Sequence, residues 1–174
     1  ELSAILHDVG KIGVPEAVLN KPDRLTPTEM AAMRTHPEKG AEILSSIRAM
    51  RDIVPGVLHH HERFDGVGYP IGLKGQNIPL LARIILVADT FDAMTSHRSY
   101  RRGLPAEVAI EEINRCSGTQ FDPALSEAFI RVFKKKYEAN FEEIRSKFEE
   151  QEKILGINMS IHIPQAGTVP QGAP

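Results

Sequence analysis

Histidines and carboxylates stand next to each other at two places in the sequence. His7 precedes Asp8, and His60 and His61 precede Glu62. Imidazole and carboxylate together suit divalent metals such as manganese, iron or zinc. Adjacent residues on a helix point about 100° apart, so each adjacent pair is expected to serve two ions side by side rather than to chelate one. The two oxygens of Asp8 would allow it to bridge such ions.

Each of these patterns also has an ordinary explanation. A His-Asp pair is usually structural, and a run of histidines at a helix end is often only a solvated face. His36 before Pro37 indicates, by itself, no more than the start of a helix. Asp89 is different because it follows the apolar stretch 84–88 and is expected to be buried. A buried charge must be paired or bound to metal, so we favour Asp89 as a metal ligand.

Lys11 is the first basic residue that could act on a phosphate. It follows Asp8 by three positions and His7 by four, so it shares their face if the helix continues. A lysine beside several metal ions can hold a phosphate oxygen and offset its developing charge. The alternative is a structural ion pair with Asp92, which lies three residues after Asp89.

Arg98, Arg101 and Arg102 form a basic cluster that follows Asp92 along the chain. Guanidinium groups match phosphate oxygens with two parallel hydrogen bonds. Surface solvation explains such a cluster equally well, and the spacing alone leaves both interpretations open.

The elements that must position these residues are helical. Apolar spacing predicts helices that end near Val9, begin at an N-cap at Thr26 or Thr28, lead from Ile53 into the histidines, and cover 80–95 and 105–115. Glycines and prolines break up residues 62–79, which predicts a long functional loop. From Pro123 a long helix carries an aromatic stripe, which we interpret as a packing surface. The predicted fold class is all-α, a helical bundle with one long loop.

Composition limits the classes of function. The 174 residues carry a net charge of −2, with a pI near 6.4, which argues against binding to a nucleic acid polymer or an anionic membrane. No apolar run approaches the roughly 20 residues that span a bilayer. The single cysteine, Cys116, fits a reducing compartment, so we expect a cytoplasmic location.

The chain opens on Glu1 inside a helical pattern, and we interpret it as a piece of a longer protein. We expect a main domain over residues 1–135 and a helical extension over 136–155. The uncharged segment 156–174 is rich in proline, glycine and glutamine, and it is expected to be a disordered tail.

Taken together, four segments resemble the HD-GYP branch of the HD phosphohydrolase superfamily. Residues 7–15, 36–40, 60–70 and 88–100 resemble, in order, the HDxGKxGxP, HPxxG, HHExxDGxGYP and ADxFDAxT..RxY motifs of that branch. The resemblance runs from residue 1 to about residue 130 and implies an HD-type helical bundle.

The resemblance implies a role for particular residues. The implied metal ligands are His7, Asp8 (bridging), His36, His60, His61 and Asp89. Lys11 would contact the scissile phosphate, and Asp92 would orient Lys11. Tyr69, Arg98 and Arg101 would line the substrate pocket. His59 has no counterpart in the pattern and is expected to be structural. Similar domains have further helices with another histidine ligand before the HD motif, and that region lies outside this chain.

The implied function is hydrolysis of cyclic di-GMP to pGpG or GMP, with two or three divalent ions, iron or manganese, activating water. The resemblance also implies partners: a GGDEF-domain protein that meets the Gly-Tyr-Pro loop, and a sensor or receiver domain upstream. Two alternatives are a catalytically silent module that binds a cyclic dinucleotide or a GGDEF partner, and an HD phosphohydrolase that acts on mononucleotides. The Gly-Tyr-Pro loop and Arg98 favour the cyclic dinucleotide.

Overall fold

The computed structural model describes residues 1–96 and 102–155, with side chains up to residue 140 apart from residue 138. Within these ranges the regular elements are helices, and no strand is present, as the all-α prediction requires. The α-helices are α1 (Leu2–Leu6), α2 (Glu16–Leu19), α3 (Pro27–Met33), α4 (His36–Ser45), α5 (Val54–Leu58), α6 (Leu80–Thr95), α7 (Ala106–Arg115) and α8 (Pro123–Leu155). Three short 3₁₀ helices join them: η1 (Val9–Gly13), η2 (Arg48–Ile53) and η3 (Gly75–Asn77).

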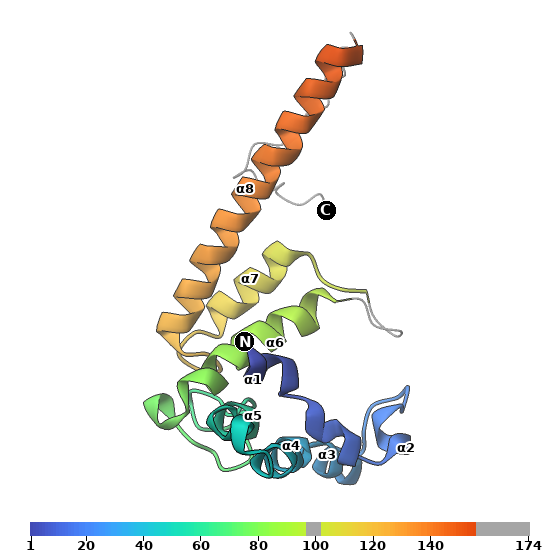
Figure 1. The fold of residues 1–174 in the computed structure, drawn as a ribbon, viewed down its shortest axis with the longest axis vertical. Coiled ribbons are helices and arrows are strands. Elements are labelled where there is room, and N and C mark those ends of the chain that lie inside the picture. The colour runs from blue at the N-terminus through green and yellow to red at the C-terminus, as the bar shows by residue number, and fades with distance from the viewer. Residues whose placement is uncertain (97–101, 156–174) are drawn as a thin grey trace, which may run out of the picture. The chain divides into compact units, whose positions relative to one another are not determined.

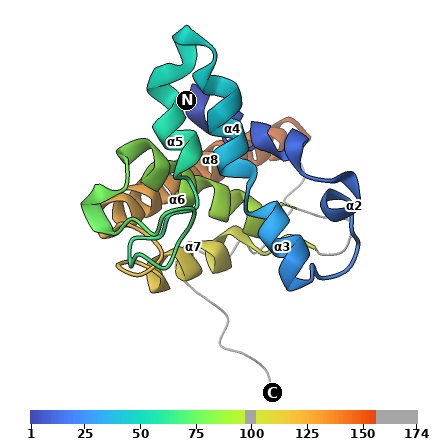
Figure 2. The ribbon, with the colours of Figure 1, turned by 90° about the horizontal axis from the view of Figure 1, so that it is seen from below.

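Helix α6 forms the centre of the first part of the chain. It packs against α5 on one side and α7 on the other, and α5 also contacts α1 and α4 (Figures 1 and 2). Ala82, Ile85 and Leu86 of α6 are buried, at the three- and four-residue spacing that places them on one helical face. The predicted helix over 80–95 is confirmed, with the same bounds.

The start of α3 resolves the choice between two predicted caps. Thr26 is the N-cap: its hydroxyl accepts from the Glu29 backbone N–H at 3.3 Å, and the Glu29 carboxylate accepts from the Thr26 N–H at 2.7 Å. Lys21 also donates to the Glu29 carboxylate at 2.7 Å. This capping box satisfies two backbone donors that a helix start would otherwise leave free.

Two helices are shorter than the sequence pattern indicates. Helix α1 ends at Leu6, and Asp8 leaves α-helical geometry at φ −97° and ψ 4° before the chain winds on as the tighter η1. Helix α5 ends at Leu58, so the three histidines 59–61 follow the helix rather than lie on it. The condition under which Lys11 would share an α-helical face with Asp8, a helix that continues past Asp8, is therefore not met.

A close backbone contact joins η1 to the start of α4. A Cβ added to Gly10 would lie 1.9 Å from the His36 carbonyl oxygen and 2.4 Å from the Gly40 nitrogen. Real Cβ atoms do not approach backbone this closely, so only glycine fits. Gly10 therefore allows η1, with Asp8 and Lys11 at its sides, to lie directly against the first turn of α4.

The segment 62–79 is a loop interrupted only by η3. Gly66 and Gly72 adopt positive φ of 86° and 80°, which favours glycine at these turns. The backbone N–H groups of Phe64 and Asp65 donate to the carbonyls of Gln120 and Thr119, at 3.1 and 2.8 Å. These bonds fix the loop to the turn that precedes α8.

The chain divides into two compact units, the first being Glu1–Phe129 and the second starting at Ile130. Helix α8 passes without a break through the boundary that the sequence suggested at residue 135. Phe129 contacts Phe91 within the first unit, and Phe133 stacks on Tyr137 within the second, so these members of the aromatic stripe have ring partners. Residues 156–174 lie outside the described residues.

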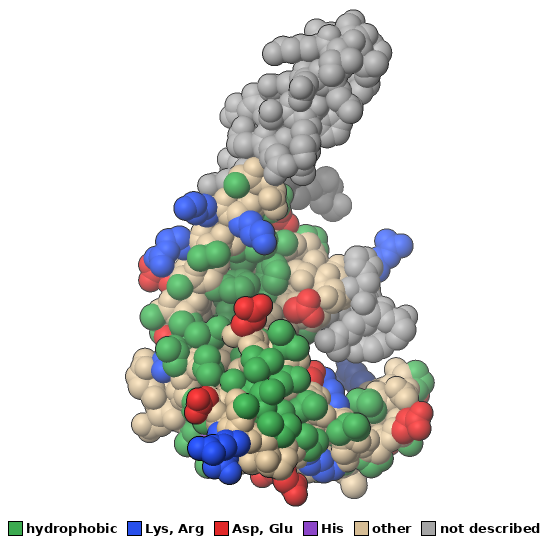
Figure 3. Space-filling model, in the orientation of Figure 1, with side chains coloured by type: hydrophobic (Ala, Val, Ile, Leu, Met, Phe, Trp, Pro, Cys, Tyr) green, Lys and Arg blue, Asp and Glu red, His purple; other side chains and the backbone are tan. Residues whose placement is uncertain are grey.

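Apolar side chains remain exposed on the first unit. Leu2 and Ile5 of α1 are 42% and 68% exposed, and Ile84 of α6 is 45% exposed. Figure 3 shows hydrophobic side chains gathered on the face that carries these two helices. Such patches often mark contact surfaces. Among the described helices, none is both long enough and apolar enough to cross a membrane.

Candidate metal centre

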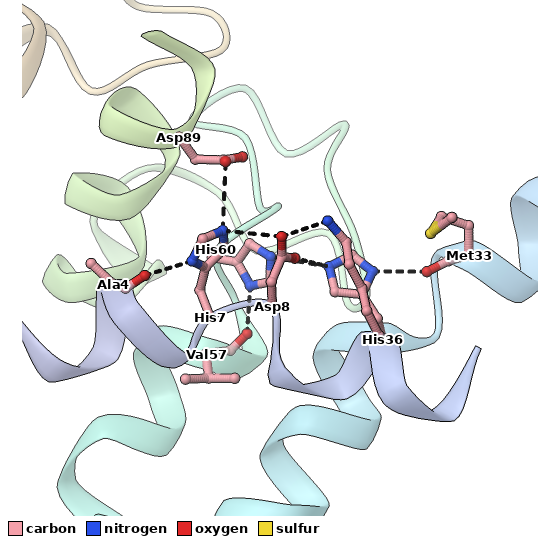
Figure 4. A network of polar contacts seen from close by, with 9 residues as sticks. Ala4, His7, Asp8, Met33, His36, Val57, His60 and Asp89 are labelled. Atoms are coloured by element: carbon pink, nitrogen blue, oxygen red, sulfur yellow. Dashed lines mark hydrogen bonds and ion pairs between the residues drawn. The ribbon is translucent and has the colours of Figure 1, made fainter. Parts of the chain in front are cut away.

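Four parts of the fold bring the predicted ligands into one place. His7 and Asp8 join α1 to η1, His36 begins α4, and the histidines after α5 face them. Asp89 reaches the group from α6 (Figure 4). The six predicted ligands, His7, Asp8, His36, His60, His61 and Asp89, thus approach one another from segments that are far apart in the sequence.

Three of the imidazoles are oriented in the same way. Each has Nδ1 against the backbone carbonyl three residues earlier: His7 with Ala4 at 2.6 Å, His36 with Met33 at 2.8 Å, and His60 with Val57 at 2.6 Å. A neutral imidazole has one donor and one acceptor nitrogen. With Nδ1 as the donor, Nε2 keeps its lone pair, and this is the tautomer that metal-binding histidines commonly adopt.

The Nε2 atoms converge on one another and on two carboxylates (Figure 4). His36 Nε2 lies 3.2 Å from His60 Nε2 and 3.2 Å from an Asp8 oxygen. His7 Nε2 lies 3.5 Å from oxygens of both Asp8 and Asp89, and it is buried without a hydrogen-bond partner. Lone pairs and carboxylate oxygens that converge in this way repel one another unless a cation lies between them. The donor set therefore fits divalent metal.

The ligand atoms form two overlapping groups. His36, His60 and His61 form one, and His7, Asp8 and His60 form the other, with all ligand atoms of a group within 4.8 Å of one another. Each group could hold one ion. Since His60 Nδ1 is engaged by Val57, only its Nε2 is free, so His60 can serve one ion at a time.

This geometry corrects one prediction. Adjacent histidine and aspartate were expected to point to different ions, yet His7 and Asp8 belong to one group, as do His60 and His61. The 100° divergence expected for about 3.6 residues per turn holds only inside an α-helix. Both pairs lie just past a helix end, where the backbone turns two neighbouring side chains toward one point.

The carboxylates and imidazoles influence one another's protonation. Burial raises the pKa of Asp8, but contacts with His36 and Lys11 outweigh it and hold this pKa well below its usual range. Contact with Asp89 raises the pKa of His7, and the same contact lowers the pKa of Asp89. The centre thus keeps both carboxylates charged and attracts positive charge toward His7.

The other two histidines respond in the opposite direction. Burial lowers the pKa of His60 to about 4, and burial with the neighbouring imidazoles lowers that of His61 to about 3. Both rings are therefore neutral at physiological pH, which is the form that binds metal.

Lys11 lies beside the ligands. Its ammonium is 2.5 Å from an Asp8 oxygen. Asp92, the alternative partner considered from the sequence, is exposed and accepts from the Ser96 hydroxyl at 3.1 Å. In this structure, then, Lys11 forms its ion pair with Asp8 rather than with Asp92.

Tyr69 links the long loop to the metal ligands. Its ring stacks on His61, with ring centres 4.8 Å apart and planes at 24°. The guanidinium carbon of Arg34 lies 5.2 Å from the centre of the same ring. Sequence reasoning did not single out Arg34, because an exposed arginine at the end of a short helix has no distinctive spacing.

Glu62 holds the loop in place. Its side chain is fully buried and accepts from the backbone N–H groups of Ile71, Gly72 and Leu73 at 2.8–3.1 Å. His59, which the sequence suggested to be structural, lies 3.7 Å from the same carboxylate. Glu62 was noted in the sequence only as a neighbour of histidines; its position before a glycine-rich segment was the signal for this role.

Two other predicted residues, Arg98 and Arg101, lie outside the described residues.

Comparisons with known proteins identify the family of this chain. A family model described as HD domain matches residues 1–125. A cyclic di-GMP phosphodiesterase of Pseudomonas aeruginosa is 46% identical over 132 residues, covering 75% of this chain and 32% of that protein. The cyclic di-GMP phosphodiesterase response regulator RpfG of Xanthomonas campestris is 46% identical, covering 75% and 35%. A cyclic di-GMP phosphodiesterase of Thermotoga maritima is 44% identical, covering 77% and 37%. The chain spans about a third of the length of these relatives.

Two solved structures share the fold. A cyclic GMP-AMP specific phosphodiesterase of Vibrio cholerae superposes with a TM-score of 0.57 at 25% identity, covering 76% of this chain and 37% of that one. An HDG"Y"P protein of Bdellovibrio bacteriovorus gives a TM-score of 0.59 at 22% identity, covering 76% and 42%, and supports the fold alone. The predicted family resemblance is confirmed: this chain belongs to the HD domain family, and its relatives include cyclic di-GMP phosphodiesterases.

Proposed function

We propose that this chain forms the metal-binding part of a phosphodiesterase that hydrolyses cyclic di-GMP to pGpG, GMP or both. The observation that carries the proposal is the convergence of three Nε2 atoms, each ring oriented by a backbone carbonyl, on the carboxylates Asp8 and Asp89. The relatives that are cyclic di-GMP phosphodiesterases support the choice of substrate.

Two or three divalent ions, iron or manganese, would be held by the six ligands and would activate water and offset phosphate charge. The neutral His60 and His61 rings would bind metal without losing a proton first. Asp8, with Lys11 and His36 on its two oxygens, would bridge ions.

The remaining side chains would act on the substrate. Lys11 would hold an oxygen of the scissile phosphate as negative charge builds there. Asp92, one turn after Asp89 on α6, is proposed to orient Lys11 in the substrate complex. Tyr69 is proposed to line the pocket beside His61, together with Arg98 and Arg101.

Partners and location form part of the same proposal. The Gly-Tyr-Pro loop exposes Val67 and Ile71, at 77% and 66%, and these apolar side chains would suit contact with a GGDEF-domain protein. A sensor or receiver domain upstream is supported by the response-regulator relative. We propose a cytoplasmic location, since the one cysteine, Cys116, cannot form an intrachain disulfide.

The test is turnover of cyclic di-GMP with added manganese or iron(II), with pGpG and GMP separated by chromatography. Asp8→Ala should abolish turnover, while the exposed Asp52→Ala should keep it. Near-normal turnover by Asp8→Ala, with its metal content unchanged, would contradict the assignment. Binding without turnover by the unaltered protein would instead support a silent module. Because some relatives are 3'3'-cGAMP-specific, at 38–42% identity, cyclic GMP-AMP should be assayed in parallel.

A further inference from the structure

Arg34 occupies a fixed position beside the metal centre. It ends α3 as the C-cap, and its backbone N–H donates to the Met30 carbonyl at 2.9 Å. The residue before it, Met33, supplies the carbonyl that orients His36. The backbone at Arg34 therefore directly follows the carbonyl that orients one of the candidate metal ligands.

The Arg34 side chain is linked to the candidate metal ligands by two stacked rings, those of Tyr69 and His61. Its guanidinium lies over the Tyr69 ring at 5.2 Å, and that ring stacks on His61 at 4.8 Å. A guanidinium over a tyrosine face is attracted by the ring's π electrons.

Arg34 has hydrogen-bond donors that remain available. Within the described part of the chain, no carboxylate lies at ion-pair distance from it. Three lysines of residues 1–39 are engaged: Lys11 pairs with Asp8, Lys21 with Glu29, and Lys39 donates to the Gly13 carbonyl. A guanidinium stacked by its plane still presents N–H groups along its edge.

A cyclic dinucleotide carries two phosphodiester groups, and only one can be at the metal ions in a given cleavage. We propose that Arg34 binds the other phosphate, the one not being cleaved. Guanidinium matches the oxygens of a phosphodiester bidentately. This inference rests on the proposed function and adds a substrate contact to it.

The test compares a substrate with two phosphates and one with a single phosphate. Arg34→Gln should raise KM for cyclic di-GMP about 10- to 100-fold, the loss of a charged hydrogen-bonded pair, with kcat within about threefold because the contact exists before and during cleavage. Hydrolysis of bis(p-nitrophenyl) phosphate, which has one phosphate, should be unchanged. Arg34→Lys should recover part of the affinity, and the exposed Arg24→Gln is the matched control.

Three outcomes would overturn the inference: an unchanged KM for cyclic di-GMP in Arg34→Gln, an equal loss with the single-phosphate substrate, or an equal loss in Arg24→Gln. The second would make Arg34 a support for Tyr69 and His61 rather than a substrate contact. The failure of the proposed function is seen separately, as the absence of cyclic di-GMP hydrolysis by the unaltered protein.

Discussion

The Nε2 atoms of His36 and His60 face each other at 3.2 Å, while both Nδ1 atoms lie against backbone carbonyls. With both rings neutral, this arrangement points two lone pairs at one another. Only a proton or a metal cation between them makes the contact favourable. The backbone thus holds these two rings in a geometry that a cation bound between them would stabilise.

Divalent metal should therefore stabilise the folded protein. At a free concentration about 100 times the dissociation constant, binding adds about 2.7 kcal/mol to the free energy of unfolding. We expect manganese to raise the melting temperature, and EDTA to reverse the rise. His60→Asn should remove the effect of the metal, whereas the exposed Arg48→Gln should leave it intact. A melting temperature that is the same with manganese and with EDTA would argue against a metal site.

Removing the Lys11 ammonium should slow chemistry more than it weakens metal binding. If Lys11 stabilises charge on the scissile phosphate, Lys11→Gln should lower kcat about 10²- to 10³-fold. Metal content, measured by atomic emission after dialysis, should remain at the unaltered level. Parallel losses of metal and activity would show that Lys11 serves mainly to hold Asp8, which it contacts at 2.5 Å.

Glu62→Gln should release the Gly-Tyr-Pro loop. The change weakens hydrogen bonds from three backbone N–H groups to a buried carboxylate, and we expect a loss of about 3 kcal/mol in the free energy of unfolding. Urea unfolding measures this loss. Amide exchange of Ile71, Gly72 and Leu73 should accelerate at the same time. The exposed Glu111→Gln should change neither quantity, and slow exchange in Glu62→Gln would contradict the anchoring role.

In the metal-free protein, the pKa values of the site histidines should be shifted in opposite directions from the ordinary value. Because of Asp89, His7 should keep its proton above the ordinary pKa of 6.5. Burial lowers the pKa of His60 to about 4 and that of His61 to about 3. Imidazole chemical shifts followed by NMR from pH 3 to pH 8 would distinguish them. Equal titration of the three rings near 6.5 would contradict the geometry.

These shifts also set the sign of the pH dependence of stability. Between pH 6.5 and about pH 4, His60 is protonated in the unfolded chain but stays neutral in the folded protein. The contribution of neutral, buried His60 to the free energy of unfolding is therefore full above pH 6.5, and it is lost as the pH falls from 6.5 to about 4. His7 acts oppositely: its contribution is full below pH 6.5 and is lost as pH rises through its raised pKa. Urea unfolding of the metal-free protein at pH 5 and pH 7, with and without His60→Asn, isolates the first effect.

Much of the fold could be predicted because its signals are local. The helix over 80–95 follows from apolar spacing, and a cap at Thr26 or Thr28 follows from their hydroxyl groups, although only the structure selected Thr26. The exact ends of α1 and α5 could not be predicted, because nothing in the spacing shows where a helix yields to a turn. The error in the helix ends also affected the prediction for the ligands. On an α-helix the side chains of His7 and Asp8 would point apart, whereas in the structure they point toward one place.

The sequence by itself determined which residues could bind metal, since imidazole and carboxylate chemistry belongs to residue type and the four motifs occur in order. Only the tertiary structure decided how these residues combine. It brought α1, α4, α5 and α6 together, selected the Nδ1–H tautomer through the carbonyls of Ala4, Met33 and Val57, and placed Arg34 over Tyr69. The physical reason is that ring orientation, burial and pKa depend on neighbours distant in the chain, which no local spacing encodes.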